Sequence, residues 1–85
     1  MADVTLYSRK NCSPCSAASG WLKTLAEKYA FEYEVVDVDE DPLNERRYGG
    51  RVPVVSTSHE ELLDSPFSER RLGDLMRQRF LPRKD

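Results

Sequence analysis

Cys12 and Cys15 are the only two cysteines of this 85-residue chain, and Ser13 and Pro14 separate them. Residues three positions apart on a helix lie about 5–6 Å from each other, which is compatible with a disulfide bond. The pair follows an apolar run and opens a stretch with helical spacing. One thiol is therefore expected at a helix N-terminus, where the backbone dipoles favour the thiolate. The thiolate is the reactive form, so the motif predicts thiol–disulfide exchange.

The two cysteines are expected to have different roles. Cys12 stands at the helix entrance and is predicted to be the nucleophile, because such a position lowers a thiol pKa from about 8.5 to roughly 3.5–7.5. Cys15 comes one turn later and is predicted to be the resolving thiol. The expected cycle is attack by Cys12 on a substrate disulfide, a mixed disulfide, and displacement by Cys15.

Two other interpretations of the cysteine pair stay open. A structural disulfide that closes so small a loop would contribute only about 2 kcal/mol in the chain-entropy treatment. A closed zinc site needs four ligands, and the chain offers one cysteine pair and His59, its only histidine. No metal site is expected within one chain. A zinc or iron–sulfur carrier would have to bridge two chains.

The hydrophobic pattern around the pair predicts the order β-α-β-α-β-β-α. Alternation and β-branched residues indicate strands, and spacings of three and four indicate helices. Asp41 and Ser68 are expected to cap the second and third helices. The predicted strands cover residues 4–7, 31–38, 52–55 and 61–63, and the predicted helices cover residues 15–29, 42–49 and 69–80.

These elements predict an α/β fold with a four-stranded mixed sheet. A strand–helix–strand unit makes its two strands parallel, and the two later strands form an antiparallel hairpin. Helices are expected on both faces of the sheet. Residues 1–85 are interpreted as a single domain, with residues 82–85 as a flexible tail.

Composition limits the possible partners and the compartment. The net charge of −2 offers no general attraction to nucleic acid. No apolar stretch approaches the ~18 residues of a membrane span, and the N-terminus does not resemble a signal peptide. We therefore expect a cytoplasmic protein with no membrane or nucleic-acid partner. In that reducing compartment a cysteine pair is more often catalytic or metal-binding than structural.

Three segments carry a resemblance to a known family: Leu6–Cys15, Val35–Asp39 and Arg51–Val54. In glutaredoxins, three segments are similar to these in turn. The first is a strand followed by a basic residue and Cys-x-x-Cys, and the second is a second strand that ends in acidic residues. The third is the proline segment beside the active site. Over roughly residues 4–80 the chain resembles the thioredoxin fold in its compact glutaredoxin form. It looks most similar to the small bacterial glutaredoxin-like proteins.

The resemblance implies a substrate site built by Arg9, Pro14, Val52 and Pro53. Arg9 matches the basic position of glutaredoxins, where it could stabilise the thiolate and attract an anionic substrate. The resemblance also implies a cis Val52–Pro53 bond, which would hold the Val52 backbone toward the sulfurs for pairing with an extended substrate. Without the resemblance, Pro53 is a proline that opens a strand.

The sequence departs from glutaredoxins at positions that concern the substrate. Pro14 stands where glutaredoxins usually carry an aromatic residue and resembles thioredoxin instead. Residues 64–67 replace the Gly-Gly turn and following Asp that hold glutathione. We therefore expect a monomeric oxidoreductase without a cofactor that acts on protein disulfides in cellular redox homeostasis. Its recycling partner would be an unidentified reductase or glutathione. Glutathione-dependent exchange through Cys12 alone is the alternative.

Overall fold

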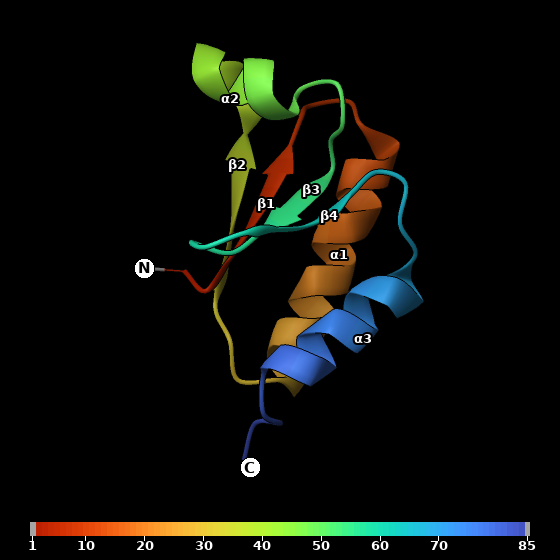
Figure 1. Ribbon diagram of the computed structural model, residues 1–85. Coiled ribbons are helices and arrows are strands. Elements are labelled where there is room, and N and C mark those ends of the chain that lie inside the picture. The colour runs from red at the N-terminus through yellow and green to blue at the C-terminus, as the bar shows by residue number, and fades with distance from the viewer. Residues whose placement is uncertain (1, 85) are drawn as a thin grey trace.

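The protein forms a four-stranded sheet with three α-helices, as the computed structural model describes for residues 2–84 (Figure 1). The order β-α-β-α-β-β-α is confirmed, with one additional 3-10 turn, η1. No helix within residues 2–84 is long and apolar enough to cross a membrane. The elements are β1 (Val4–Ser8), α1 (Ser13–Lys28), β2 (Tyr33–Asp37), η1 (Val38–Glu40), α2 (Pro42–Tyr48), β3 (Val54–Ser56), β4 (Glu61–Asp64) and α3 (Glu69–Arg79).

The sheet is mixed and has the strand order β2-β1-β3-β4. β1 pairs with β2 in parallel, while β3 is antiparallel to both β1 and β4. Tyr7 pairs with Val54, and Val54 pairs with Asp64. The end of β1, the start of β3 and the end of β4 therefore lie at one edge of the sheet, and the loops that extend from them gather there.

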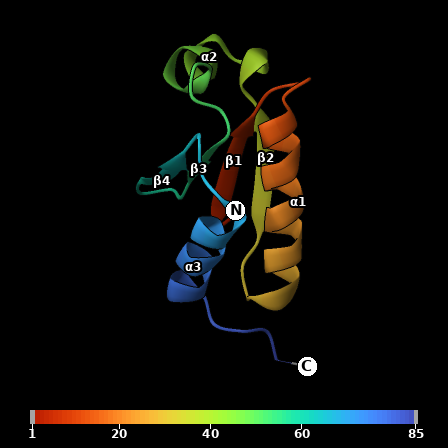
Figure 2. The same cartoon turned by 90° about the vertical axis from the view of Figure 1, so that its right-hand side faces the viewer.

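The hydrophobic core lies between one face of the sheet and two helices. Figure 1 shows α1 and α3 on the same side of the strands, and Figure 2 views the molecule from that side. Side chains alternate along a strand, so Leu6 points into this core and Tyr7 points to the other face. There Tyr7 stacks on Tyr48 of α2, with the ring centroids 4.0 Å apart. The core cluster consists of Val4, Leu6, Ala18, Leu22, Tyr29, Phe31, Val55, Leu72 and Met76.

Polar side chains cap the helices where the sequence predicts them. The Asp41 carboxylate accepts a hydrogen bond from the Leu43 N–H at the start of α2. The Ser68 hydroxyl accepts one from the Arg71 N–H at the start of α3. Each cap satisfies a backbone donor that has no partner within its own helix.

The structure differs from the prediction at the C-terminus. The loose tail does not begin at Pro82, which forms an isolated bridge with Tyr29. The Arg83 side chain donates to the Ala26 carbonyl at 2.6 Å and to the Phe31 carbonyl at 3.0 Å. This segment therefore occupies carbonyls at the end of α1 and in the following loop. Residue 85 lies outside the described residues.

Candidate active site

Cys12 is the N-cap residue of α1, as the sequence predicts. Its Sγ accepts a hydrogen bond from the Cys15 N–H at 3.2 Å, and its carbonyl accepts one from the Ser16 N–H at 3.0 Å. The residue is half-buried. A helix N-terminus combines free N–H donors with partial positive charge, so this position stabilises negative charge on the Cys12 sulfur.

Cys15 lies one turn into α1 and is 1 % exposed. The two cysteines form a disulfide, with their Cα atoms 5.2 Å apart. Pro14 stands between them in the first helical turn and is exposed. Cys15 is therefore covered by the protein, whereas Cys12 is partly exposed. The roles of Cys12 as nucleophile and Cys15 as resolving thiol stay predictions.

Asn11, directly before Cys12, has a left-handed backbone conformation that was not predicted from the sequence. Its φ is 57°, in the left-handed region, and it is the only non-glycine residue with positive φ among residues 2–84. Asn adopts this conformation more readily than most residues do. The sequence could have indicated this conformation, because residue 11 is an asparagine in a short polar loop between a predicted strand and a predicted helix.

The Val52–Pro53 peptide bond is cis, as the resemblance predicts. Pro53 is buried and Val52 is partly exposed. The bond precedes β3 at the edge where the loop after β1 leads to Cys12. Among residues 2–84, no group hydrogen-bonds to the Val52 backbone N–H or C=O. A second cis bond, Ser65–Pro66, lies in the loop after β4 and was not predicted.

Arg9 is held by groups of the protein itself. Its guanidinium pairs with Asp39 through Nε–Oδ2 and Nη2–Oδ1, both at 3.0 Å. It also contacts Glu45 Oε1 at 3.4 Å and donates to the Gly49 carbonyl at 3.1 Å. The hydrogen bond to Asp39 is the main cause of a raised Arg9 pKa. These contacts connect the loop before Cys12 to η1 and α2, and substrate binding by Arg9 stays a prediction.

Arg51 is a second arginine with many internal contacts, and no role for this side chain was predicted from the sequence. It directly precedes Val52 and pairs with Glu61 and Asp64. Hydrogen bonding to Glu61 is the main cause of its raised pKa. The two carboxylates lie 10 and 13 residues further along the chain, so only the register of β3 and β4 brings them to Arg51.

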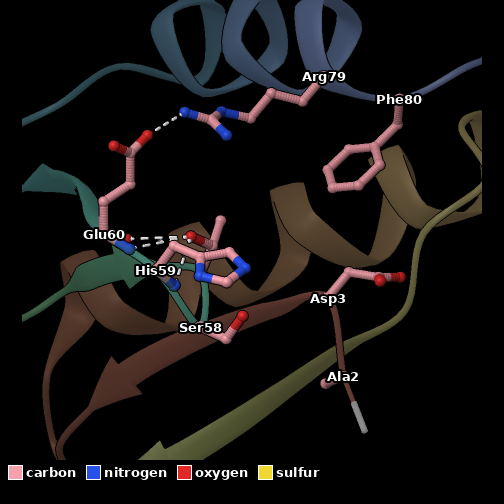
Figure 3. A pocket seen from close by; sticks show the side chains of 8 residues that line it. Ala2, Asp3, Ser58, His59, Glu60, Arg79 and Phe80 are labelled. Carbon is pink, nitrogen blue, oxygen red and sulfur yellow. Dashed lines mark hydrogen bonds and ion pairs between the residues drawn. The ribbon is translucent and has the colours of Figure 1, made fainter.

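A pocket of about 600 Å³ lies at the opposite end of β1 from the cysteines. Figure 3 shows Ser58, His59 and Glu60 on one side of this pocket and Asp3 on the other, with Arg79 paired to Glu60. Neither cysteine lines this pocket, so it is separate from the disulfide. Within residues 2–84, no group of three or more His, Cys, Asp or Glu side chains could hold a metal ion.

Known proteins are similar to this chain over most of its length. Residues 3–77 match the family described as a glutaredoxin-like domain (DUF836). The X-ray structure of protein XcR50 from X. campestris is 33 % identical, with a TM-score of 0.73 over 88 % of this chain and 96 % of that one. No curated protein sequence matches the chain.

Two further structures show the fold. A thioredoxin variant from Halobacterium salinarum is 30 % identical, with a TM-score of 0.65 over 91 % of this chain and 74 % of its own. The glutaredoxin from Archaeoglobus fulgidus is 23 % identical, with a TM-score of 0.66 over 91 % of this chain and 88 % of that one. The fold is therefore thioredoxin-like. With a close cysteine pair at the start of α1 and a family match over residues 3–77, the chain belongs to the glutaredoxin-like family.

Proposed function

We propose that this protein is a thiol–disulfide oxidoreductase that exchanges electrons with disulfides of protein substrates through Cys12 and Cys15. One observation carries the proposal. The Cys12 sulfur caps α1 and accepts a backbone hydrogen bond, while the Cys15 sulfur is covered and within bonding reach. A hydrogen bond to the charged form and a helix N-terminus both favour a thiolate.

The disulfide seen in the structure is the oxidised form of the proposed enzyme. In the reduced form, the Cys12 thiolate attacks one sulfur of a substrate disulfide. A mixed disulfide forms, and the other substrate sulfur leaves as a thiolate that takes up a proton. Cys15 loses its proton and attacks the Cys12 sulfur, which releases the second substrate thiolate. Two electrons pass to the substrate, and the Cys12–Cys15 disulfide forms again.

The unpaired backbone of Val52 supports a polypeptide substrate. An N–H and a C=O without an internal partner need water or a ligand. An extended peptide can supply both partners, as in other forms of strand addition. Pro14, which is exposed in the first turn of α1, would border the same substrate. A protein reductase or glutathione would return the disulfide to the dithiol.

The test combines single-cysteine variants with a redox titration. We expect alkylation of the reduced protein with iodoacetamide to show an accessible, acidified Cys12 and a hindered Cys15. Cys12→Ser should abolish disulfide exchange. Cys15→Ser should stop turnover at the mixed disulfide, which mass spectrometry would detect. Ser13→Ala is the matched control within the motif and should retain exchange.

Other outcomes would identify other functions. Sustained deglutathionylation by Cys15→Ser would favour the glutathione-dependent alternative over the dithiol cycle. A coloured or zinc-containing dimer that a chelator dissociates would favour a carrier that bridges two chains. Equal, slow alkylation of both cysteines would contradict the proposal.

A further inference from the structure

We propose that Arg51 is a positioning residue that holds the Val52 backbone in place for the protein substrate. The inference rests on the proposed function, because it concerns how the same site recognises its substrate. Arg51 directly precedes Val52, and its own contacts reach α2, β4 and the loop after β4. Each of these contacts restricts the position of the next residue in the chain.

The Arg51 guanidinium forms a bidentate pair with the Glu61 carboxylate through both of its terminal nitrogens. Nη1 lies 2.5 Å from Glu61 Oε2, and Nη2 lies 3.1 Å from Glu61 Oε1. Nη1 also contacts Asp64 Oδ2 at 3.2 Å. A bidentate pair fixes orientation as well as distance. β4 therefore determines the direction in which this side chain extends from the segment before β3.

The same guanidinium contacts the C-terminal end of α2. Nη2 donates to the Arg47 carbonyl at 2.9 Å, and the guanidinium carbon lies 5.7 Å from the Tyr48 ring centroid. The last carbonyls of a helix lack partners within the helix and carry partial negative charge, so a cation there is favourable. Lysine could not reproduce this set of contacts, because only arginine presents several donors in one rigid plane.

The backbone of Arg51 is held as well. Its N–H donates to the Tyr48 carbonyl at 2.8 Å, and its carbonyl accepts from the Ser65 N–H at 3.2 Å. The Val52 N–H follows that carbonyl in the same peptide unit, and peptide units are planar. The hydrogen bond from Ser65 therefore also fixes the plane in which the unpaired Val52 N–H lies.

An aromatic stack extends these contacts toward the redox loop. Tyr48, beneath the Arg51 guanidinium, stacks on Tyr7 of β1. β1 leads through Arg9 to Cys12 at the same edge of the sheet. The loop that offers backbone groups to a substrate and the loop that carries the nucleophile are thus tied to the same end of α2.

The test compares two disulfides in single-turnover reactions of the fully reduced protein. Insulin presents a disulfide within a polypeptide, and 2-hydroxyethyl disulfide has no peptide backbone. Misplacement by about 1 Å can cost up to a hundredfold in rate, so we expect Arg51→Met to slow the insulin reaction by roughly ten- to a hundredfold. The rates with 2-hydroxyethyl disulfide and with iodoacetamide should stay within about twofold, because Cys12 is unaltered.

Three further variants separate positioning from charge and from loss of folding. Arg77→Met is the matched control, since Arg77 pairs with Asp74 within α3 and should react like the wild type. Arg51→Lys keeps the charge without the planar donors, so its insulin rate should resemble that of Arg51→Met. Glu61→Gln removes the charge of the bidentate partner and gives a milder variant if Arg51→Met does not fold. Wild-type insulin rates in Arg51→Met, or in Arg51→Lys, would overturn the inference.

An activity-independent measurement separates this inference from the proposed function. In ¹⁵N NMR spectra, Arg51→Met should broaden or shift the Val52 and Val54 amide signals, and Arg77→Met should leave them unchanged. If the wild type reacted with neither disulfide, the proposed function would fail, while the NMR comparison would still decide whether Arg51 positions Val52. Unchanged Val52 signals in Arg51→Met would overturn the positioning role.

Discussion

The guanidinium of Arg9 and the carboxylate of Asp39 form a two-point ion pair between residues 30 positions apart in the sequence. Arg9 precedes the Cys12–Cys15 motif, and Asp39 belongs to η1. The pair therefore attaches the loop before Cys12 to the connection between β2 and α2. The family resemblance assigns Arg9 to substrate binding. In the structure, the hydrogen-bond donors of its guanidinium are directed to groups of the protein itself.

We predict that Arg9→Met lowers the midpoint of thermal unfolding and leaves the pH profile of Cys12 alkylation unchanged. The physical reason is that two carboxylates, Asp39 and Glu45, already compensate the charge of Arg9. Asp39→Asn should lower the midpoint similarly, and the double variant should lose less than the sum of the two, as expected for residues in contact. A marked rise of the Cys12 pKa in Arg9→Met would instead assign Arg9 to the thiolate.

We predict that Gly49→Ala destabilises the protein. A Cβ at Gly49 would lie 2.5 Å from the Glu45 carbonyl oxygen and 2.8 Å from Arg9 Nη2. The backbone at Gly49 is ordinary right-handed helix, so the clash and not the conformation is the cause. Overpacking of this kind costs about 1–3 kcal/mol in the free energy of unfolding, which urea denaturation would measure.

Gly20→Ala is the matched control for Gly49→Ala. Gly20 lies within α1, and a Cβ there meets nothing within 4 Å. Alanine is favoured over glycine inside a helix by about 0.8–1.0 kcal/mol, so this variant should gain stability. If Gly49→Ala gained stability as Gly20→Ala does, the clash with the Glu45 carbonyl oxygen and Arg9 would be contradicted.

We predict that Tyr7→Phe makes stability less sensitive to alkaline pH. The pKa of Tyr7 is raised above its ordinary value of 10.0, first by burial and then by Tyr48 and Glu34. The folded protein therefore holds the phenol proton more tightly than the unfolded chain does. The corresponding stability is fully present below about pH 10 and is lost as the pH rises through the folded-state pKa.

Urea unfolding of Tyr7→Phe at increasing pH would measure this effect. Phenylalanine keeps the ring for stacking on Tyr48, and only the titrating hydroxyl is removed. Tyr33→Phe, which removes a hydroxyl from β2, is the comparison variant. Parallel loss of stability above pH 10 in the wild type and in Tyr7→Phe would contradict the role of this group.

The sequence predicted features that depend on neighbours within a few residues. The Asp41 and Ser68 caps act on N–H groups two or three positions away, so they can be recognised without knowledge of the fold. The Cys12–Cys15 pair is likewise local, because three positions on a helix bring the two residues together. The parallel β1–β2 pair follows from the strand–helix–strand order.

The tertiary structure decided every feature that depends on the path of the chain between distant residues. Arg9 and Arg51 are ordinary loop arginines in the sequence, and only the placement of η1, α2 and β4 gives them their carboxylates. Arg83 in the expected tail similarly finds carbonyls more than 50 residues away. Hydrophobic periodicity and helix caps depend on the local backbone, whereas ion pairs between distant residues depend on how all the intervening elements are placed. The sequence alone therefore determined the close cysteine pair and its helix, and the fold determined which residues hold that pair and its neighbouring loop in place.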